Sequence, residues 1–255
     1  MLAIQTCGRE CKCYDFAVRS WVHVQRPEDD TGGSYPAVIF FHHGPGFDAG
    51  SEQAVKLIAD AGYLVVALDR YRRFEPWAQF DMSALRDPNP ENPERDRFMS
   101  MITGTNDEHV EEDVTEIFAA LPDEPGVRPG PVGCIGYCIG ARSVLRTMRD
   151  HADVVAAGVL LHPAFCVTAE PDSPHRSVNS LRGELYLAVG SADQLSPLDE
   201  NRPLIDAVAA LGERGVIDVH EGADHGFAVP GSPSYQEAAA TRSYEQALAL
   251  FGKVL

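Results

Sequence analysis

The chain has 255 residues, of which 44% are hydrophobic and 23% are charged, and this composition excludes a disordered or collagen-like protein. Its formal net charge of −17 makes binding to nucleic acid or to anionic membranes unfavourable. The chain opens without a basic segment followed by an apolar stretch, and no apolar run approaches the roughly 18 residues of a membrane span. With six cysteines, we expect a cytoplasmic protein whose thiols are reduced.

The first third of the chain predicts two kinds of strand. Residues 14–24 alternate between apolar and polar side chains, which indicates a half-buried strand near a sheet edge. The continuous apolar run 37–41 is typical of a strand covered on both faces. A helix is expected from Ser51, as its N-cap, to Gly62, and a second apolar strand over 63–68.

Residues 70–106 break this regularity with several prolines, many arginines and scattered aromatic side chains. We expect a lid-like excursion with short helices, forming part of the pocket wall, because long connections of this kind are usually functional. Regularity resumes at Thr105-x-x-Glu108, a capping-box pattern that predicts the start of a helix.

The remaining elements alternate between strands and helices. The sequence predicts strands over 132–137, 154–161, 185–189 and 216–221, and helices over 139–150, 203–211 and from about 234 to 251. Such alternation implies right-handed crossovers and a mostly parallel central sheet with helices on both faces. We therefore expect one α/β domain over 1–255, with its site beyond the carboxyl ends of the strands.

The segment Gly136-Tyr137-Cys138-Ile139-Gly140 stands between a predicted strand and a predicted helix. It has the pattern of a nucleophile elbow, with cysteine in place of serine. The glycines allow the strained turn, and the following helix points its N-terminus at the thiol, which favours thiolate. Cys138 is the predicted nucleophile; the alternative is an inert buried cysteine in a glycine-rich turn.

A cysteine nucleophile needs a base, and the base needs an orienting acid. Asp193 and His225 follow two later strands in the chain order that this kind of fold uses. Asp224 is a rival acid, but its adjacency to His225 makes it a poor partner for the imidazole. His220 lies within a strand and is expected to pack there.

An oxyanion hole requires backbone donors near the nucleophile. The N–H of Ile139 is one candidate. The loop after residues 37–41, His42-His43-Gly44-Pro45-Gly46, supplies the other, and Gly44 is preferred because Pro45 has no N–H.

These motifs together resemble the dienelactone hydrolase family of α/β-hydrolases, over about residues 35–70 and 105–255. The resemblance implies an α/β-hydrolase fold and a Cys138–Asp193–His225 triad. It also implies cleavage of a small ester or lactone through an acyl-cysteine, with no metal and no organic cofactor. The segments that carry it are 136–142, Ala192-Asp193, 223–227, 35–41, 69–73, 171–175 and 228–230.

Two positions depart from the founding members of that family. A glutamate in their first oxyanion loop corresponds to His43 here, and an arginine that binds the substrate carboxylate corresponds to Val229. The chemistry therefore carries over better than the substrate. We expect His43, Tyr71, Arg72 and Arg142 to contact substrate, although an arginine is more often solvated or salt-bridged.

Two other functions stay open at this point. The acyl-cysteine could be captured by a nucleophile other than water, which would make the protein an acyltransferase or cyclase in a biosynthetic pathway. The chain could also be a non-catalytic small-molecule binding protein on a hydrolase fold. Either a monomer or a homodimer is compatible with the acidic surface. Cys7, Cys11 and Cys13 lack a fourth ligand nearby, so no metal site is predicted there.

Overall fold

The computed structural model describes residues 19–28, 31–86, 89 and 91–255. These residues form a seven-stranded sheet in the order β1-β3-β2-β4-β5-β6-β7. Every neighbouring pair is parallel except β1 and β3, which are antiparallel. The predicted mostly parallel sheet is therefore confirmed. The strands are β1 (Val22–Gln25), β2 (Ala37–Phe41), β3 (Leu64–Leu68), β4 (Val132–Tyr137), β5 (Val155–Leu161), β6 (Glu184–Gly190) and β7 (Gly215–His220).

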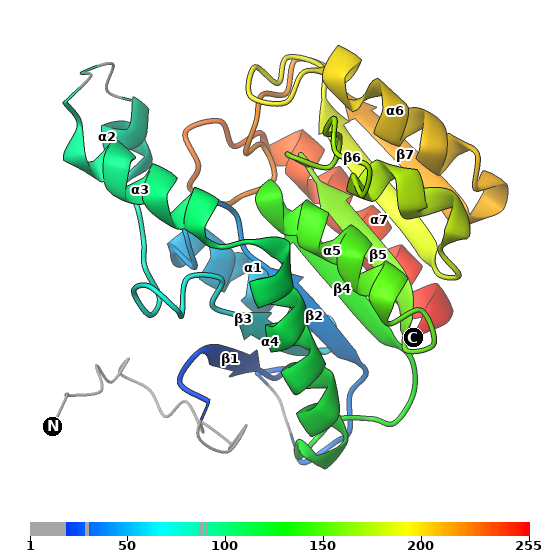
Figure 1. Ribbon diagram of the computed structural model, residues 1–255. Helices are drawn as coiled ribbons and strands as arrows, with labels where there is room; N and C mark the ends of the chain where they lie inside the picture. The colour runs from blue at the N-terminus through cyan, green and yellow to red at the C-terminus, as the bar shows by residue number, and fades with distance from the viewer. Residues whose placement is uncertain (1–18, 29–30, 87–88, 90) are drawn as a thin grey trace, which may run out of the picture.

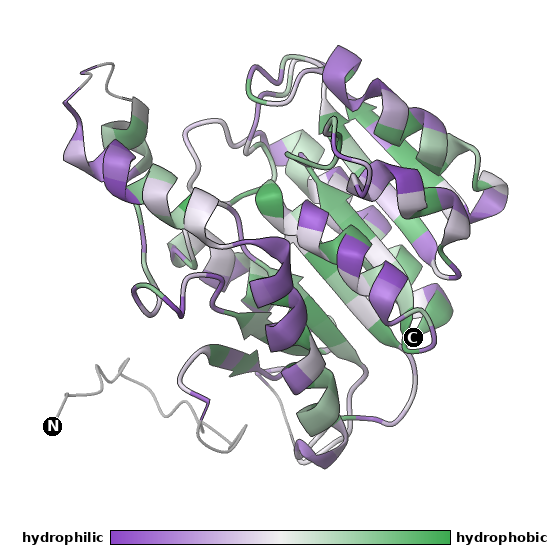
Figure 2. Cartoon of the chain, in the orientation of Figure 1, coloured by the Kyte–Doolittle hydropathy of each residue, from purple (hydrophilic) through white to green (hydrophobic). Residues whose placement is uncertain are grey.

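Helices cover both faces of this sheet (Figure 1). One apolar layer packs α1 (Ala49–Asp60) and α7 (Glu237–Val254) against the strands, and the other packs α4 (Asp107–Ala120), α5 (Ile139–Asp150) and α6 (Leu198–Ala209). The inner strands β2 and β3 are buried along their whole length, as strands between two helical layers must be. Figure 2 shows the same division, with green strands inside and purple outer faces on the helices.

Three elements differ from their expected boundaries. Of the strand predicted over 14–24, only β1 is seen, and residues 14–18 lie outside the described part. Helix α6 begins at Leu198 rather than at Pro203, so this proline stands inside the helix. Because proline has no N–H, the helix lacks the hydrogen bond that residue 203 would otherwise donate to the carbonyl four residues earlier. Helix α7 begins at Glu237, after a turn in which Tyr235 N–H donates to Ser232 O.

Two predicted helix caps are wrong. Asp48, not Ser51, caps α1, and its side chain accepts a hydrogen bond from the N–H of Ser51 at 2.8 Å. Asn106 rather than Thr105 caps α4. The N–H of Thr105 still bonds Met101 O and so completes the preceding helix, which leaves the next residue as the first that can cap.

Residues 70–106 hold the short helices α2 (Met82–Arg86) and α3 (Pro93–Gly104). They gather a small apolar cluster of their own, which contains Tyr71, Ala78, Phe80 and Met101. On α3, Ile102 packs against the cluster of Cys138, Ile139 and Ala164. The C-terminal turn of this excursion therefore lies against the turn between β4 and α5.

That turn is built on a strained backbone. Cys138 follows β4 with φ 54° and ψ −120°, in a region that side chains other than glycine rarely adopt. A Cβ on Gly136 would collide with the backbone of Gly140, and a Cβ on Gly140 would collide with the carbonyl oxygen of Phe41. The two glycines thus let β4, α5 and the end of β2 come into contact.

We expect Gly140→Ala to lower the free energy of unfolding by about 1–3 kcal/mol, because the new methyl group forces backbone apart in a fully packed region. Helix propensity alone favours the opposite result. Gly252→Ala is the matched control, since a Cβ there meets its nearest neighbour at 3.9 Å, and it should leave stability unchanged or slightly higher. Urea unfolding of both variants measures the difference; equal stabilities would contradict the collision.

Candidate active site

The structure brings three of the predicted residues to one end of the sheet. Cys138, Asp193 and His225 follow β4, β6 and β7 respectively. Asp193 Oδ2 lies 2.8 Å from His225 Nδ1, so the imidazole donates a hydrogen bond through Nδ1–H. Its Nε2 takes no part in this bond. The other oxygen of Asp193 accepts hydrogen bonds from the N–H groups of Leu195 and Ser196 at 2.9 and 2.8 Å. These bonds fix the carboxylate that orients the ring.

The sulfur of Cys138 and the ring of His225 form a charge-coupled pair. Nε2 of His225 is buried and makes no hydrogen bond of ordinary geometry within the described chain. The two groups nevertheless lie close enough to shift each other's titration. Burial acts to raise the pKa of Cys138, but the charge and contact of His225 and two backbone N–H groups outweigh it and lower that pKa.

His225 shifts in the complementary direction. Burial acts to lower the pKa of its imidazole, but attraction to the Cys138 sulfur and the hydrogen bond that the ring donates to Asp193 outweigh burial and raise that pKa. A lowered thiol pKa beside a raised imidazole pKa favours a thiolate–imidazolium pair. A thiolate is the form of cysteine that attacks a carbonyl carbon.

Two backbone N–H groups act on the same sulfur, those of Ile139 and Gly44. They are the two donors that the sequence suggested for an oxyanion hole. The Gly44 loop is held in place by Tyr71, whose hydroxyl donates to Gly44 O at 2.6 Å. His42 braces the loop as well, since its Nδ1 lies 2.7 Å from His43 O. The donors are thus set before any substrate arrives.

The four residues expected to contact substrate fall into two groups. Tyr71 is fully buried under the Gly44 loop, and His43 is paired with Asp48 at 3.0 Å. Both therefore support the loop beside the sulfur. Whether either contacts substrate remains a prediction.

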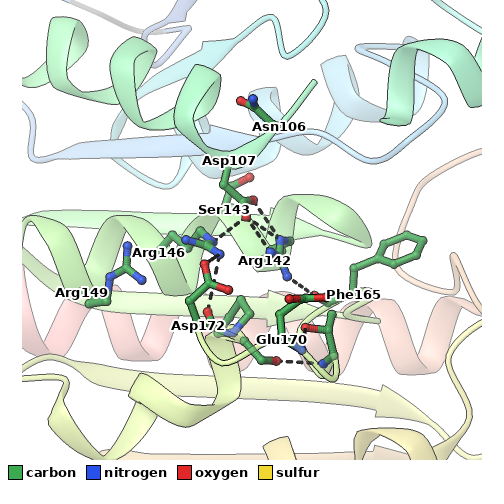
Figure 3. A network of polar contacts seen from close by, with 12 residues as sticks. Asn106, Asp107, Arg142, Ser143, Arg146, Arg149, Phe165, Glu170 and Asp172 are labelled. Carbon is green, nitrogen blue, oxygen red and sulfur yellow. Dashed lines mark hydrogen bonds and ion pairs between the residues drawn. The ribbon is translucent and has the colours of Figure 1, made fainter. Parts of the chain in front are cut away.

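The two arginines are held by acidic residues. Arg72 pairs with Asp113 at 2.5 Å and stacks on Trp21 at 4.0 Å. Arg142 pairs with Asp107 at 2.5 Å, and its other nitrogen donates to Phe165 O (Figure 3). Their guanidinium groups are occupied in ways that join elements of the fold, so neither enters the proposal below.

The rival residues have other partners. Asp224 accepts hydrogen bonds from the N–H groups of Gln194 and His225, which shapes the two loops rather than the ring. His220 Nε2 lies 3.0 Å from Ser243 Oγ, and the expectation that it packs within its strand is confirmed.

Sequence reasoning missed His162. It follows β5 with φ 36°, is 1% exposed, and both of its ring nitrogens lack hydrogen-bond partners among the described residues. Its ring meets that of His225 edge to face, with centroids 4.9 Å apart. Burial and the charge of His225 hold its pKa well below the usual value, so it is neutral. The sequence signal that could have identified His162 is its position directly after a buried strand.

The part of the chain that the structure describes contains neither a metal-binding cluster nor a membrane-spanning helix. There, no group of three or more His, Cys, Asp or Glu side chains is arranged to hold a metal ion. No described helix combines the length and apolarity that crossing a bilayer requires. The Cys7, Cys11 and Cys13 cluster lies outside the described residues.

Comparison with known proteins places this geometry in context. The family model described as "Dienelactone hydrolase family" matches residues 22–255. A Synechocystis sp. protein named "Putative carboxymethylenebutenolidase" is 27% identical over 225 residues, covering 86% of each chain. "Dienlactone hydrolase 1" of Gibberella moniliformis is 26% identical over 207 residues, covering 81% of this chain and 73% of that protein.

A solved structure supports the fold. The structure titled "Crystal Structure of Putative Dienelactone Hydrolase" from Klebsiella pneumoniae subsp. pneumoniae matches with a TM-score of 0.74 and 22% identity, covering 91% of this chain and 92% of that one. The predicted α/β-hydrolase fold is confirmed, and the predicted carboxylic ester hydrolase class agrees with the names of the relatives. Because the family model spans nearly the whole chain, this protein belongs to the dienelactone hydrolase family.

Proposed function

We propose that this protein hydrolyses a small ester or lactone through an acyl intermediate on Cys138. The single observation that carries the proposal is the pairing of Asp193 with His225 at 2.8 Å, with the same imidazole next to the sulfur on the strained turn. The names of the relatives, a carboxymethylenebutenolidase and a dienlactone hydrolase, support a lactone or ester as the substrate class.

Acylation begins with the Cys138 thiolate attacking the carbonyl carbon. The negative charge moves to the carbonyl oxygen, where the N–H groups of Gly44 and Ile139 stabilise it. The carbon–oxygen bond to the leaving group then breaks, and His225 gives its proton to the departing alkoxide. Asp193 keeps the ring oriented and stabilises its positive charge.

Deacylation uses the same groups in reverse order. His225, now neutral, takes a proton from a water molecule as the oxygen of that water attacks the thioester carbon. The tetrahedral intermediate collapses, the carbon–sulfur bond breaks, and Cys138 leaves as thiolate. The acid is released and the thiolate–imidazolium pair is restored, so each cycle consumes one water.

Packing around the sulfur favours a compact acyl group. Cys138 is 8% exposed and is contacted by Ile102 and Ala164. A Cβ built on Gly44 would lie 3.0 Å from the ring of Phe98, so α3 closes over the oxyanion loop. A bulky acyl chain would have to displace this helix.

We expect Cys138→Ala to lower kcat/KM for 4-nitrophenyl acetate and for a small lactone by about a thousandfold or more, because the attacking atom is removed. Wild-type protein quenched during turnover should carry the acyl mass on the peptide that contains Cys138. Cys166→Ala is the control: this thiol is also fully buried, and burial raises its pKa to about 12, so its removal should leave turnover nearly unchanged. Full activity in Cys138→Ala would reject the proposal.

The same pair predicts a bell-shaped dependence of kcat/KM on pH. Activity should rise as the Cys138 thiol loses its proton, below the ordinary thiol pKa because that pKa is lowered. It should fall at a pH above the ordinary histidine pKa, where His225 finally loses its proton. Asp193→Asn removes a group that raises the pKa of His225, so the upper limb should move to lower pH and kcat should fall by about 10²–10⁴. An unmoved upper limb in this variant would separate His225 from that ionisation.

A further inference from the structure

Arg70 is a buried cation without a carboxylate partner in the described chain. It follows β3, is 6% exposed, and forms none of the ion pairs found there. Nη1 donates to Ser143 Oγ at 3.3 Å and Nη2 donates to Thr105 O at 3.1 Å, while Nε is buried and unpaired. A buried arginine is costly unless its charge is met. Neutral acceptors satisfy two of its nitrogens but leave the charge unmatched.

Arg70 contacts two elements that lie near the Cys138 sulfur. Its backbone N–H donates to His42 Nε2 at 3.2 Å, and His42 opens the loop that carries Gly44. Its side chain reaches Ser143 on α5, and it shares the lining of a small cavity with His42, Gly140 and Ser143. The guanidinium therefore lies against α5 at Ser143, and the backbone of the same residue is bonded to the loop that carries Gly44.

The groups that can carry negative charge and that act on Arg70 include Tyr71, Asp107 and Cys138. Burial raises the pKa of Tyr71, so its phenol is neutral, and its hydroxyl is committed to Gly44 O. Asp107 is already shared by Arg142 and Arg146, at 2.5 and 2.8 Å (Figure 3). Of the three, the Cys138 sulfur is the one that can become an anion with a single further cation beside it, the His225 imidazolium.

We propose that Arg70 is an electrostatic positioning residue, whose buried charge stabilises the Cys138 thiolate and then the oxyanion that replaces it. The stabilisation of the oxyanion rests on the proposed function. The stabilisation of the thiolate does not, because it requires no substrate. The charge is carried by the segment after β3, not by the β7–α7 loop that holds His225. It therefore persists when His225 gives up its proton during acylation, which the imidazolium charge does not.

The titratable groups that act on the sulfur come from several elements. His225 approaches from the loop after β7, Arg70 and Tyr71 from the segment after β3, and Cys166 from the loop after β5. Burial raises the pKa of Tyr71 and of Cys166, so both are neutral near neutral pH. Two cations, His225 and Arg70, then share the control of the thiolate.

The test is the pH dependence of alkylation of Cys138 by iodoacetamide, followed by mass spectrometry of its peptide so that other thiols do not interfere. Arg70→Met and Arg70→Gln remove the charge, and Gln keeps an amide donor for Ser143 or Thr105 should the Met variant fail to fold. We expect the midpoint to rise by roughly one pH unit in either variant, which is about a tenfold lower rate below both midpoints.

Two control variants separate the effect of the Arg70 charge from the effect of its hydrogen bonds. Arg70→Lys keeps the charge and Ser143→Ala removes one hydrogen bond of Arg70, so both should alkylate with nearly the wild-type midpoint. An unshifted midpoint in folded Arg70→Gln, checked by thermal unfolding, overturns the proposal. So does a wild-type midpoint that moves with chloride concentration while that of Arg70→Gln does not, because a bound anion would then be the counter-charge. Alkylation needs no ester turnover, so failure of the hydrolase proposal would be seen separately.

Discussion

The site depends on one constraint, the positive φ of Cys138 between β4 and α5. The strained turn lifts the sulfur out of the sheet and places it at the N-terminus of a helix. It is possible only where three backbones touch, those of β4, of α5 and of the end of β2, and side chains at Gly136 or Gly140 would prevent the contact. The same contact brings the Gly44 loop beside the sulfur. One tolerated strain thus sets both the proposed nucleophile and its proposed oxyanion donors.

Burial opposes ionisation of the Cys138 thiol, and the surrounding residues offset this effect. A thiol 8% exposed would ordinarily stay protonated, as the burial of Cys134 and Cys166 illustrates by raising their pKa values. Cys138 differs because an imidazole held by Asp193 and two backbone N–H groups act on it. His162 packs a neutral ring edge to face against this imidazole. A second full positive charge there would oppose the imidazolium; a neutral, close-packed ring supports its orientation without that cost.

The sequence alone predicted the features that depend on neighbouring residues in the chain. Continuous apolar runs located β2 and β3, and the G-x-C-x-G pattern located the turn at Cys138, with the following helix at its observed bounds Ile139–Asp150. Chain order placed Asp193 and His225 after their strands because parallel strands end at one edge of a sheet. Long-range pairing was out of reach: Arg142 meets Asp107 from 35 positions away and Arg72 meets Asp113 from 41. No local pattern marks which arginine is paired and which, like Arg70, is not.

The two predicted helix caps were wrong for a related reason. Thr105 and Ser51 have good capping side chains, but each cap depends on where the neighbouring backbone stops. Thr105 is still bonded to the end of α3, and this leaves its carbonyl free to accept from Arg70 at 3.1 Å. The junction between α3 and α4 therefore links Ile102, which packs against the Cys138 cluster, with the buried Arg70. If Arg70 stabilises the thiolate as proposed, a change in α3 that admits a larger substrate would also alter thiol reactivity, because both depend on this short stretch of backbone.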